Sequence, residues 1–195
     1  MHRTVLDKVI DITERNDPDP DHASQVAKLA VVLFDGLQKL HRFCTHERDL
    51  LRIAAFLHDI GWARTMTSKH HKHSYDMIME SVIPGLPEPD RAVCALVARF
   101  HRKAEPDPDR HKPFAALPQK KRNIVEWLAG ILRVADGLDR SHFNCVQNIT
   151  CRISRDEVTL CLETKTRCDT EVWGAERKAQ LLERKLGKKL VFKVC

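Results

Sequence analysis

The stretch that decides the fold is Leu50–Gly61, which reads LLRIAAFLHDIG. Its apolar residues recur at steps of three and four, the pattern of a helix buried along one face. We expect this helix to cover about Thr45–Ile60. It would end in the adjacent pair His58 and Asp59, and the following Gly61 would allow the backbone to bend there. Imidazole and carboxylate groups at the end of a buried helix indicate a metal site.

The same period continues on both sides of this stretch and predicts a mainly α domain over residues 1–144. The helices are expected at about 23–40, 45–60, 74–81, 91–100 and 122–138. The stretch Glu105–Lys121, which is rich in proline and charge, is predicted to be a loop.

The pattern changes in residues 145–195. Apolar residues alternate with polar ones at Ile149–Ile153 and again at Val158–Leu162, which predicts two strands. A helix over about 170–186 and a closing strand, LVFKV, would follow. The sequence therefore predicts a small C-terminal β-β-α-β appendage, packed on the helical domain and serving only as structural support.

Composition limits the class of protein. A chain of 195 residues, 43% of them hydrophobic, fits one ordinary globular domain with a small appendage. Seven cysteines without a CxxC pair argue against a disulfide framework and favour a cytoplasmic protein. We expect neither a signal peptide nor a membrane span. The net charge of +6 favours an anionic partner, whereas one Tyr and three Trp make a nucleic-acid surface unlikely on stacking grounds.

Four residues form the predicted metal centre: His22, His58, Asp59 and Asp136. They stand at the ends of three separate helices, as ligands that converge on one ion must. Each has a simpler explanation when taken alone. A single histidine on a helix is usually solvated or packed in the core, and Asp136 could pair with Arg133 or Arg140.

Basic residues surround these positions in the segments KHHKHS (69–74) and RFHRK (99–103) and after the last long helix. Cations beside a site of carboxylates and imidazoles suggest that a phosphate group enters it. The predicted phosphate-binding residues are Lys69, Lys72, His73, Arg102, Lys103 and Arg140. The alternative is a solvated basic loop.

The order H…HD…D across a helical chain resembles the HD superfamily of metal-dependent phosphohydrolases. The similarity is closer to the C-terminal HD-like region of the exopolyphosphatase and guanosine pentaphosphate phosphatase family. The matching segments are HASQVAKLAVVLFDGLQKLH, LLRIAAFLHDIG, HHKHSYDMIMESVIPGLPEPDRAVCALVARFHRKAEP, ILRVADGLDRSH and EVWGAERKAQLLERKLGKKLVF.

This resemblance implies an HD-type helical bundle and, in proteins with two metals, a second ion bound here by His70 and His101. In long family members the phosphatase site lies in actin-like domains that precede this region, and this sequence has no Gly-rich phosphate loop. Exopolyphosphatase activity is therefore not carried over. The intact ligand positions favour chemistry within the HD-like domain itself.

The resulting hypothesis is a metal-dependent phosphohydrolase with one or two ions of manganese, iron, nickel, zinc or cobalt. Asp59 would be a ligand that also orients the attacking water, and His71, with His70 and His101 as alternatives, would protonate the leaving oxygen. The substrate stays open among nucleotides, guanosine polyphosphate and polyphosphate, and the protein could form a homodimer. The alternative function is a non-catalytic regulatory module that binds polyphosphate or a phosphorylated nucleotide.

Overall fold

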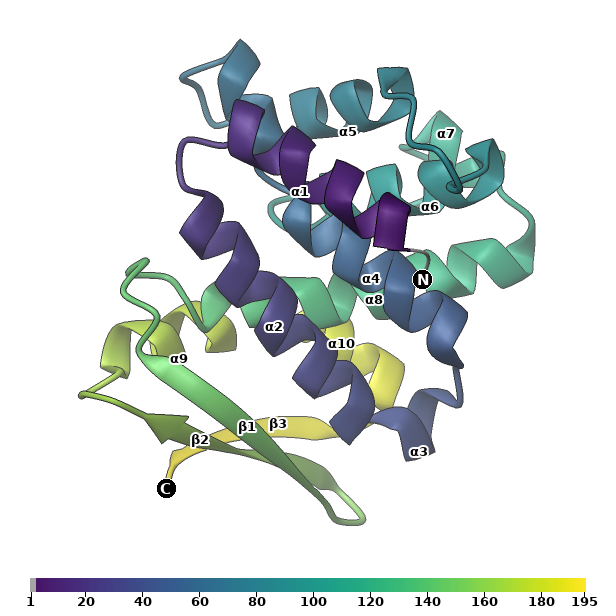
Figure 1. Cartoon of the computed structure of the whole chain (residues 1–195). Coiled ribbons are helices and arrows are strands. Elements are labelled where there is room, and N and C mark those ends of the chain that lie inside the picture. Colours follow the sequence, from purple (N-terminus) through teal and green to yellow (C-terminus); the bar gives the residue numbers. More distant parts are fainter. Residues whose placement is uncertain (1–2) are drawn as a thin grey trace.

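A computed structural model describes residues 3–195 and shows a helical body with a small sheet beneath it (Figure 1). The helical body consists of α1 (Arg3–Asn16), α2 (Pro20–Gly36), α3 (Gln38–His41), α4 (Thr45–Phe56), the 3-10 helix η1 (Ile60–Arg64), α5 (His70–Glu80), α6 (Glu88–Arg99), α7 (Lys112–Ala115) and α8 (Gln119–Gly137). The predicted mainly α fold with a C-terminal β appendage is confirmed. Within the described range, no helix is long and apolar enough to cross a bilayer.

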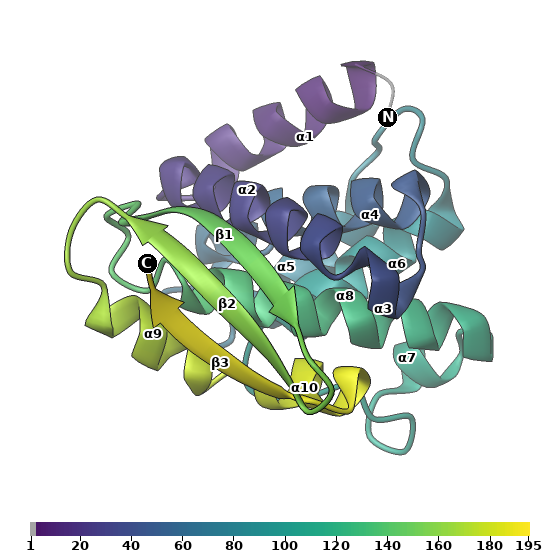
Figure 2. The same ribbon diagram turned by 90° about the horizontal axis from the view of Figure 1, so that it is seen from below.

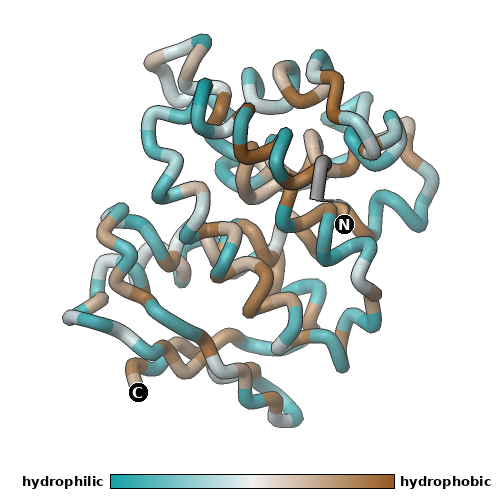
Figure 3. Tube along the Cα trace, in the orientation of Figure 1, coloured by the Kyte–Doolittle hydropathy of each residue, from teal (hydrophilic) through white to brown (hydrophobic). Residues whose placement is uncertain are grey.

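Helices α2, α4, α6 and α8 form the core of the body, where each contacts its neighbours. Their apolar residues are buried between them, and the hydrophobic segments of the trace gather in the interior of the body in Figure 3. Leu33, Leu51, Leu96 and Leu132 are among the fully buried side chains. The apolar residues spaced three and four apart in the sequence therefore belong to one hydrophobic core shared by these helices.

The helix that carries the HD pair ends earlier than predicted, at Phe56. His58 and Asp59 lie in the turn between α4 and η1, where the backbone is free to aim both side chains inward. Gly61 is required for another reason than bending: a Cβ atom there would lie 2.1 Å from the carbonyl oxygen of His70. The Gly61 N–H donates to Ser74 Oγ at 2.9 Å, so η1 and α5 are in close contact.

Other boundaries also differ from the sequence prediction. Helix α5 begins at His70, so the HHKH run forms its first turn, whereas the predicted helix began at 74. Helices α1 and α7 lie outside the predicted ranges, and α7 interrupts the predicted loop 105–121. Helix α7 has only four residues, too few for a periodic signal, whereas α1 has a clear apolar face with Val5 and Val9 buried and was not predicted.

The C-terminal part has the predicted order: β1 (Val146–Ile153), β2 (Glu157–Thr164), α9 (Asp169–Glu176), α10 (Gln180–Leu186) and β3 (Lys189–Val194). Strands β1 and β2 are antiparallel, and β3 pairs with β2 in parallel, which gives the order β1-β2-β3. Figure 2 shows the sheet from below, with β1 beside α2. The single predicted helix is divided into α9 and α10.

Both of these helices touch α8 at glycines. A Cβ atom at Gly137 would lie 2.5 Å from Ala175 Cα, and one at Gly130 would lie 3.1 Å from Leu182 Cα. Glycine allows the helix backbones to approach this closely. One hydrophobic cluster consequently runs from the helical body into the sheet, and α9 is held against the end of α8.

Candidate metal and phosphate site

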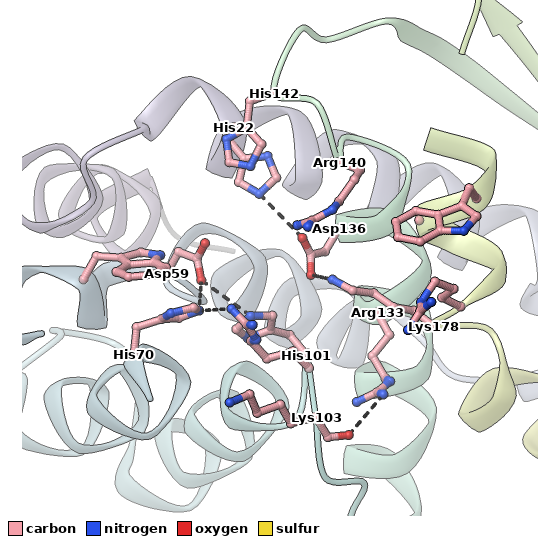
Figure 4. Close-up of a pocket in the computed structure, with 15 residues that line it drawn as sticks. His22, Asp59, His70, His101, Lys103, Arg133, Asp136, Arg140, His142 and Lys178 are labelled. Atoms are coloured by element: carbon pink, nitrogen blue, oxygen red, sulfur yellow. Dashed lines mark hydrogen bonds and ion pairs between the residues drawn. The ribbon is translucent and has the colours of Figure 1, made fainter. Parts of the chain in front are cut away.

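A cavity of about 530 Å³ opens where the helical body meets α9 (Figure 4). Its walls come from α2, the turn after α4, α5, the segment after α6, α8 and α9. The residues that line it are His22, Asp59, Trp62, His70, His101, Arg102, Lys103, Arg133, Asp136, Arg140, His142, Trp173, Gly174, Arg177 and Lys178. Imidazoles and carboxylates lie at its base, together with a large excess of cationic side chains.

Asp59 is at the centre of the donor atoms. Its Oδ1 lies 3.1 Å from His70 Nε2 and 3.5 Å from His101 Nε2, and its Oδ2 lies 3.6 Å from His58 Nε2. Two groups of possible ligand atoms each fall within 4.8 Å, one from His22, His58 and Asp59 and one from Asp59, His70 and His101. Asp59 belongs to both groups.

Three of these histidines are oriented alike. His58 Nδ1 lies 2.7 Å from the Ala55 carbonyl oxygen, and His101 Nδ1 lies 2.7 Å from that of Ala98. His22 Nδ1 lies 2.8 Å from Asp139 Oδ2. Because carbonyl and carboxylate oxygens only accept, each Nδ1–H donates outward and each Nε2 faces the centre. Metal-binding histidines are commonly held in this way.

The donor set fits a divalent transition metal. His58 Nε2 and Asp59 Oδ1 are buried and have no hydrogen-bond partner among residues 3–195. Buried polar atoms are rarely left without a partner unless a ligand supplies one. Nitrogen and carboxylate oxygen donors suit manganese, iron, cobalt, nickel or zinc.

Asp136, the fourth predicted ligand, lies beside this centre but outside both groups of converging atoms. Its Oδ1 is 3.6 Å from His22 Nε2, and its Oδ2 accepts a hydrogen bond from Lys178 Nζ. The alternative pairing with Arg133 is not formed. Arg133 instead donates to the carbonyl oxygens of Phe100 and Lys103, at 2.9 and 3.3 Å.

Neighbouring charged groups shift the pKa values of the buried aspartates and of His22. Burial alone would raise the pKa of Asp59, but the neighbouring His58 and His70 hold it well below its usual range. Burial also opposes ionisation of Asp136, and Lys178 and His22 outweigh it, so that pKa is lowered. For His22, burial lowers the pKa, but bonds to Asp136 and Asp139 raise it to about 10. Both carboxylates are therefore ionised, and without a metal His22 carries a proton.

Arg102, Lys103 and Arg140, three of the predicted phosphate-binding residues, line the cavity. Arg102 Nη1 lies 3.2 Å from His70 Nε2, within the site, and Arg140 lies on its upper rim in Figure 4.

The other basic residues predicted from the KHHKHS segment are not among the lining residues. Lys69, Lys72, His73 and His71 lie on other sides of the first turn of α5. Successive positions in a helix are rotated by about 100°, so His71 and Lys72 point away from the side on which His70 lines the cavity. His71, the predicted proton donor, lines a different cavity from the one that holds Asp59.

Aromatic side chains that the sequence analysis did not assign also shape the site. Trp62 stacks on His70 with a centroid distance of 3.9 Å. His142 stacks on His22 at 3.9 Å, and its Nδ1 lies 2.7 Å from Asp19 Oδ2. These rings restrict the orientation of the two histidines.

Trp173 of α9 contributes to the opposite wall, together with Arg177 and Lys178 in the turn that follows this helix. The Arg177 guanidinium lies over the Trp173 ring at 4.9 Å from its centroid. The C-terminal part, which was expected to serve only as support, thus contributes side chains to the cavity. The signal available in the sequence was the segment EVWGAERK, which places an aromatic residue and cations on one short helix.

The match with a known family agrees with this arrangement. The family described as Ppx/GppA phosphatase, domain III, matches residues 6–189, nearly the whole chain. The matched range includes every side chain described above, from His22 to Lys178. The chain belongs to the Ppx/GppA phosphatase family and corresponds to its domain III.

Proposed function

We propose that this domain is a metal-dependent phosphohydrolase that acts on a phosphorylated small molecule or polyphosphate. The observation that carries the proposal is the set of inward-facing Nε2 atoms around the Asp59 carboxylate, at the base of a cavity lined by cations. Carboxylate and imidazole donors hold a divalent metal, and surplus arginine and lysine neutralise phosphate oxygens. Membership of a phosphatase family supports the same class of substrate.

His22, His58 and Asp59, with Asp136 beside them, would hold one ion, and His70 and His101 would share Asp59 with a second. When bound, such a metal lowers the pKa of water and polarises the phosphoryl group. Lys178 bonds Asp136 Oδ2, so Oδ1, which lies 3.6 Å from His22 Nε2, would be the oxygen through which Asp136 acts as a ligand.

The side chains have distinct roles in this proposal. Asp59 orients the attacking water, while Arg102, Lys103 and Arg140 hold the phosphate oxygens and stabilise the charge that develops on them. His142 replaces His71 as the candidate proton donor because it lines the cavity and Asp19 orients its ring. A donor in this position would deliver its proton to the leaving oxygen.

The test is release of phosphate by the purified protein. The metal-free protein would be reconstituted with each of the five metals and assayed against nucleotides, guanosine polyphosphates and polyphosphate chains. We expect turnover that His58→Asn abolishes and that Asp76→Asn, a change on the exposed face of α5, leaves intact. Absence of turnover with every metal and substrate would contradict catalysis by this domain.

A second candidate function is a binding module without turnover. The observation that favours it is the Lys178 ammonium on Asp136, which places a cation where a metal would need a ligand. Such a module would bind a phosphorylated ligand equally well in the presence of a chelator. If the domain is instead a metal-dependent enzyme, a chelator should abolish its turnover.

A further inference from the structure

A second cavity, of about 220 Å³, is lined by residues that neighbour in sequence those of the first. Three segments line it: the first turn of α5, the end of α6 with the residues up to Ala104, and the pair Arg110–His111. The two cavities share these walls. His70 lines the first and His71 the second, while Arg102 and Lys103 line the first and Phe100 and Ala104 the second.

Positive charge dominates this second cavity. Its polar lining consists of Lys72, Arg99 and Arg110 together with two imidazoles, and none of its lining residues is acidic. The nearest carboxylate in an ion pair with them is that of Asp107, 4.0 Å from Arg110 Nε. Because Arg110 is 78% exposed there, this pair is weak and leaves most of the positive charge unbalanced.

Two of these side chains are also held in place. The Arg99 guanidinium lies over the ring of Tyr75, 5.5 Å from its centroid. The ring of His111 stands edge-on to that of Phe100 at 4.9 Å, and His111 Nδ1 contacts the backbone of Asp107. Arg99 and His111 are therefore held by packing contacts, whereas Lys72 and Arg110 are exposed at the edge of the cavity.

His71 supplies an independent sign that a ligand is missing. Its side chain lines the cavity although the residue is only 6% exposed, and its buried Nδ1 has no hydrogen-bond partner in the part of the chain that the structure describes. A buried polar group without a partner is costly. An oxygen-rich anion in the cavity would lie beside the imidazole and three cations at once.

We propose that this cavity is a second anion site, separate from the metal centre, and that it binds a phosphate group. Its volume suits one or two phosphoryl groups and is below the range of pockets that take a whole nucleotide. Arginine and lysine provide charge-assisted donors for phosphate oxygens. The first turn of α5 adds its positive helix end to the same wall.

The phosphate could be free orthophosphate or the far end of an extended phosphorylated ligand whose other end occupies the first cavity. Orthophosphate and the terminal phosphate of an extended ligand would offer the same kind of phosphate oxygens to the same side chains. The site does not require the metal centre to be catalytic, so the two proposals can fail separately.

The test is an NMR titration of the full chain, labelled with ¹⁵N, in the presence of a chelator. The amides of Ala104 and His111 report on the second cavity, and the indole N–H groups of Trp62 and Trp173 report on the first. Orthophosphate and tripolyphosphate are added separately. We expect saturable shifts of the Ala104 and His111 signals with at least one of them.

The double variant Arg99→Gln/Arg110→Gln should weaken these shifts by about tenfold or more in affinity. Arg110→Gln alone changes only an exposed side chain and keeps the test valid if the double variant misfolds. Arg155→Gln, in the exposed turn between β1 and β2, is the matched control and should bind as wild type does.

Saturation by orthophosphate alone would assign the site to free phosphate. Saturation only by tripolyphosphate, with both sets of signals moving together, would assign it to an extended ligand. Shifts confined to Trp62 and Trp173, or equal shifts in the wild type and the Arg110→Gln variant, would overturn the proposal. Loss of phosphatase activity in Asp59 variants would not affect this result.

Discussion

The ammonium of Lys178 is hydrogen-bonded to the carboxylate of Asp136, a residue 42 positions earlier in the chain. This pair joins the C-terminal part to the base of the cavity (Figure 4). The contact exists because α9 packs closely on the end of α8, where Gly137 meets Gly174 and Ala175 without side chains between them. The C-terminal part therefore sets the charge on one of the candidate metal ligands.

Replacing Lys178 should consequently strengthen metal binding. Lys178→Met keeps the stem of the side chain but removes an ammonium that competes with the ion for Asp136. We expect manganese or zinc to bind several-fold more tightly, and a phosphorylated ligand to bind more weakly, as measured by calorimetry. The control is Lys185→Met, because Lys185 pairs with Glu126 and Asn123 away from the cavity. Equal metal affinity in wild type and Lys178→Met would show that the ion pair does not limit access.

Asp59 should be the residue on which metal content depends most. It belongs to both groups of converging donor atoms, so Asp59→Ala removes a ligand from each. We expect elemental analysis of the purified variant to show loss of bound metal, while Asp76→Ala retains the content of wild type. If Asp59→Ala and wild type carry the same metal at the same occupancy, the assignment of this centre is wrong.

The stability of the metal-free protein should fall at alkaline pH because of His22. Its folded-state pKa is raised to about 10 from an ordinary value of 6.5, although burial alone would lower it. Protonated His22 therefore contributes stability that is fully present below pH 6.5 and is lost as the pH rises through about 10. The loss is on the order of 1.4 kcal/mol for each unit of the shift.

Urea unfolding of the chelated protein between pH 6.5 and 10 measures this effect, and His22→Gln should flatten the dependence. If the free energy of unfolding of the wild type falls with pH no more steeply than that of His22→Gln, His22 is neutral in the folded protein. The same proton must leave when a metal binds at His22 Nε2, so metal affinity should rise with pH over this window.

Arg133 should stabilise the segment that carries His101. It is 7% exposed and bridges the carbonyl oxygens of Phe100 and Lys103. Arg133→Ala leaves these acceptors without their donor and should lower the free energy of unfolding by about 1–3 kcal/mol. Arg133→Lys keeps the charge but lacks the planar fork, so we expect only partial recovery. Unfolding midpoints equal to wild type in both variants would contradict this role.

The sequence predicted those parts of the fold and site that follow from local periodicity and residue type. The core helices and the ligand types at their ends follow directly from the pattern around Leu50–Gly61 and 134–139. The orientation of the HHKHS run does not, because it depends on where α5 begins. That start is fixed by the tertiary contact between Gly61 and the backbone of His70 and Ser74.

Lys178 was not predicted for a related reason. Lys178 lies in the break between α9 and α10, and this break is not visible in the periodic pattern of the sequence. The nearest signal is a pair of glycines, Gly137 and Gly174, whose close approach only the folded structure reveals. Asp139 is fully buried and orients His22. It comes three residues after Asp136, a predicted ligand, but its spacing alone did not indicate this role.

The last prediction separates the basic residues that face the cavity from those that do not. Arg102 is half-buried and lies against His70, whereas Lys69 is exposed and lines neither cavity. A charge-assisted bond to phosphate in a half-buried position contributes roughly 1.5–3 kcal/mol, so Arg102→Ala should weaken phosphate binding in the metal centre by about tenfold or more. Lys69→Ala should change it by less than about 1 kcal/mol.

The readout is the shift of the Trp62 and Trp173 indole signals on titration of the metal-loaded protein with inorganic phosphate, because both rings line this cavity. Metal content is measured in parallel, since loss of the ion would itself abolish binding. Arg140→Ala, on the exposed rim, should give an intermediate loss. If Arg102→Ala and Lys69→Ala bind phosphate equally at full metal occupancy, the cations around the centre are a solvated surface. The phosphohydrolase proposal would then rest on the metal ligands and the family alone.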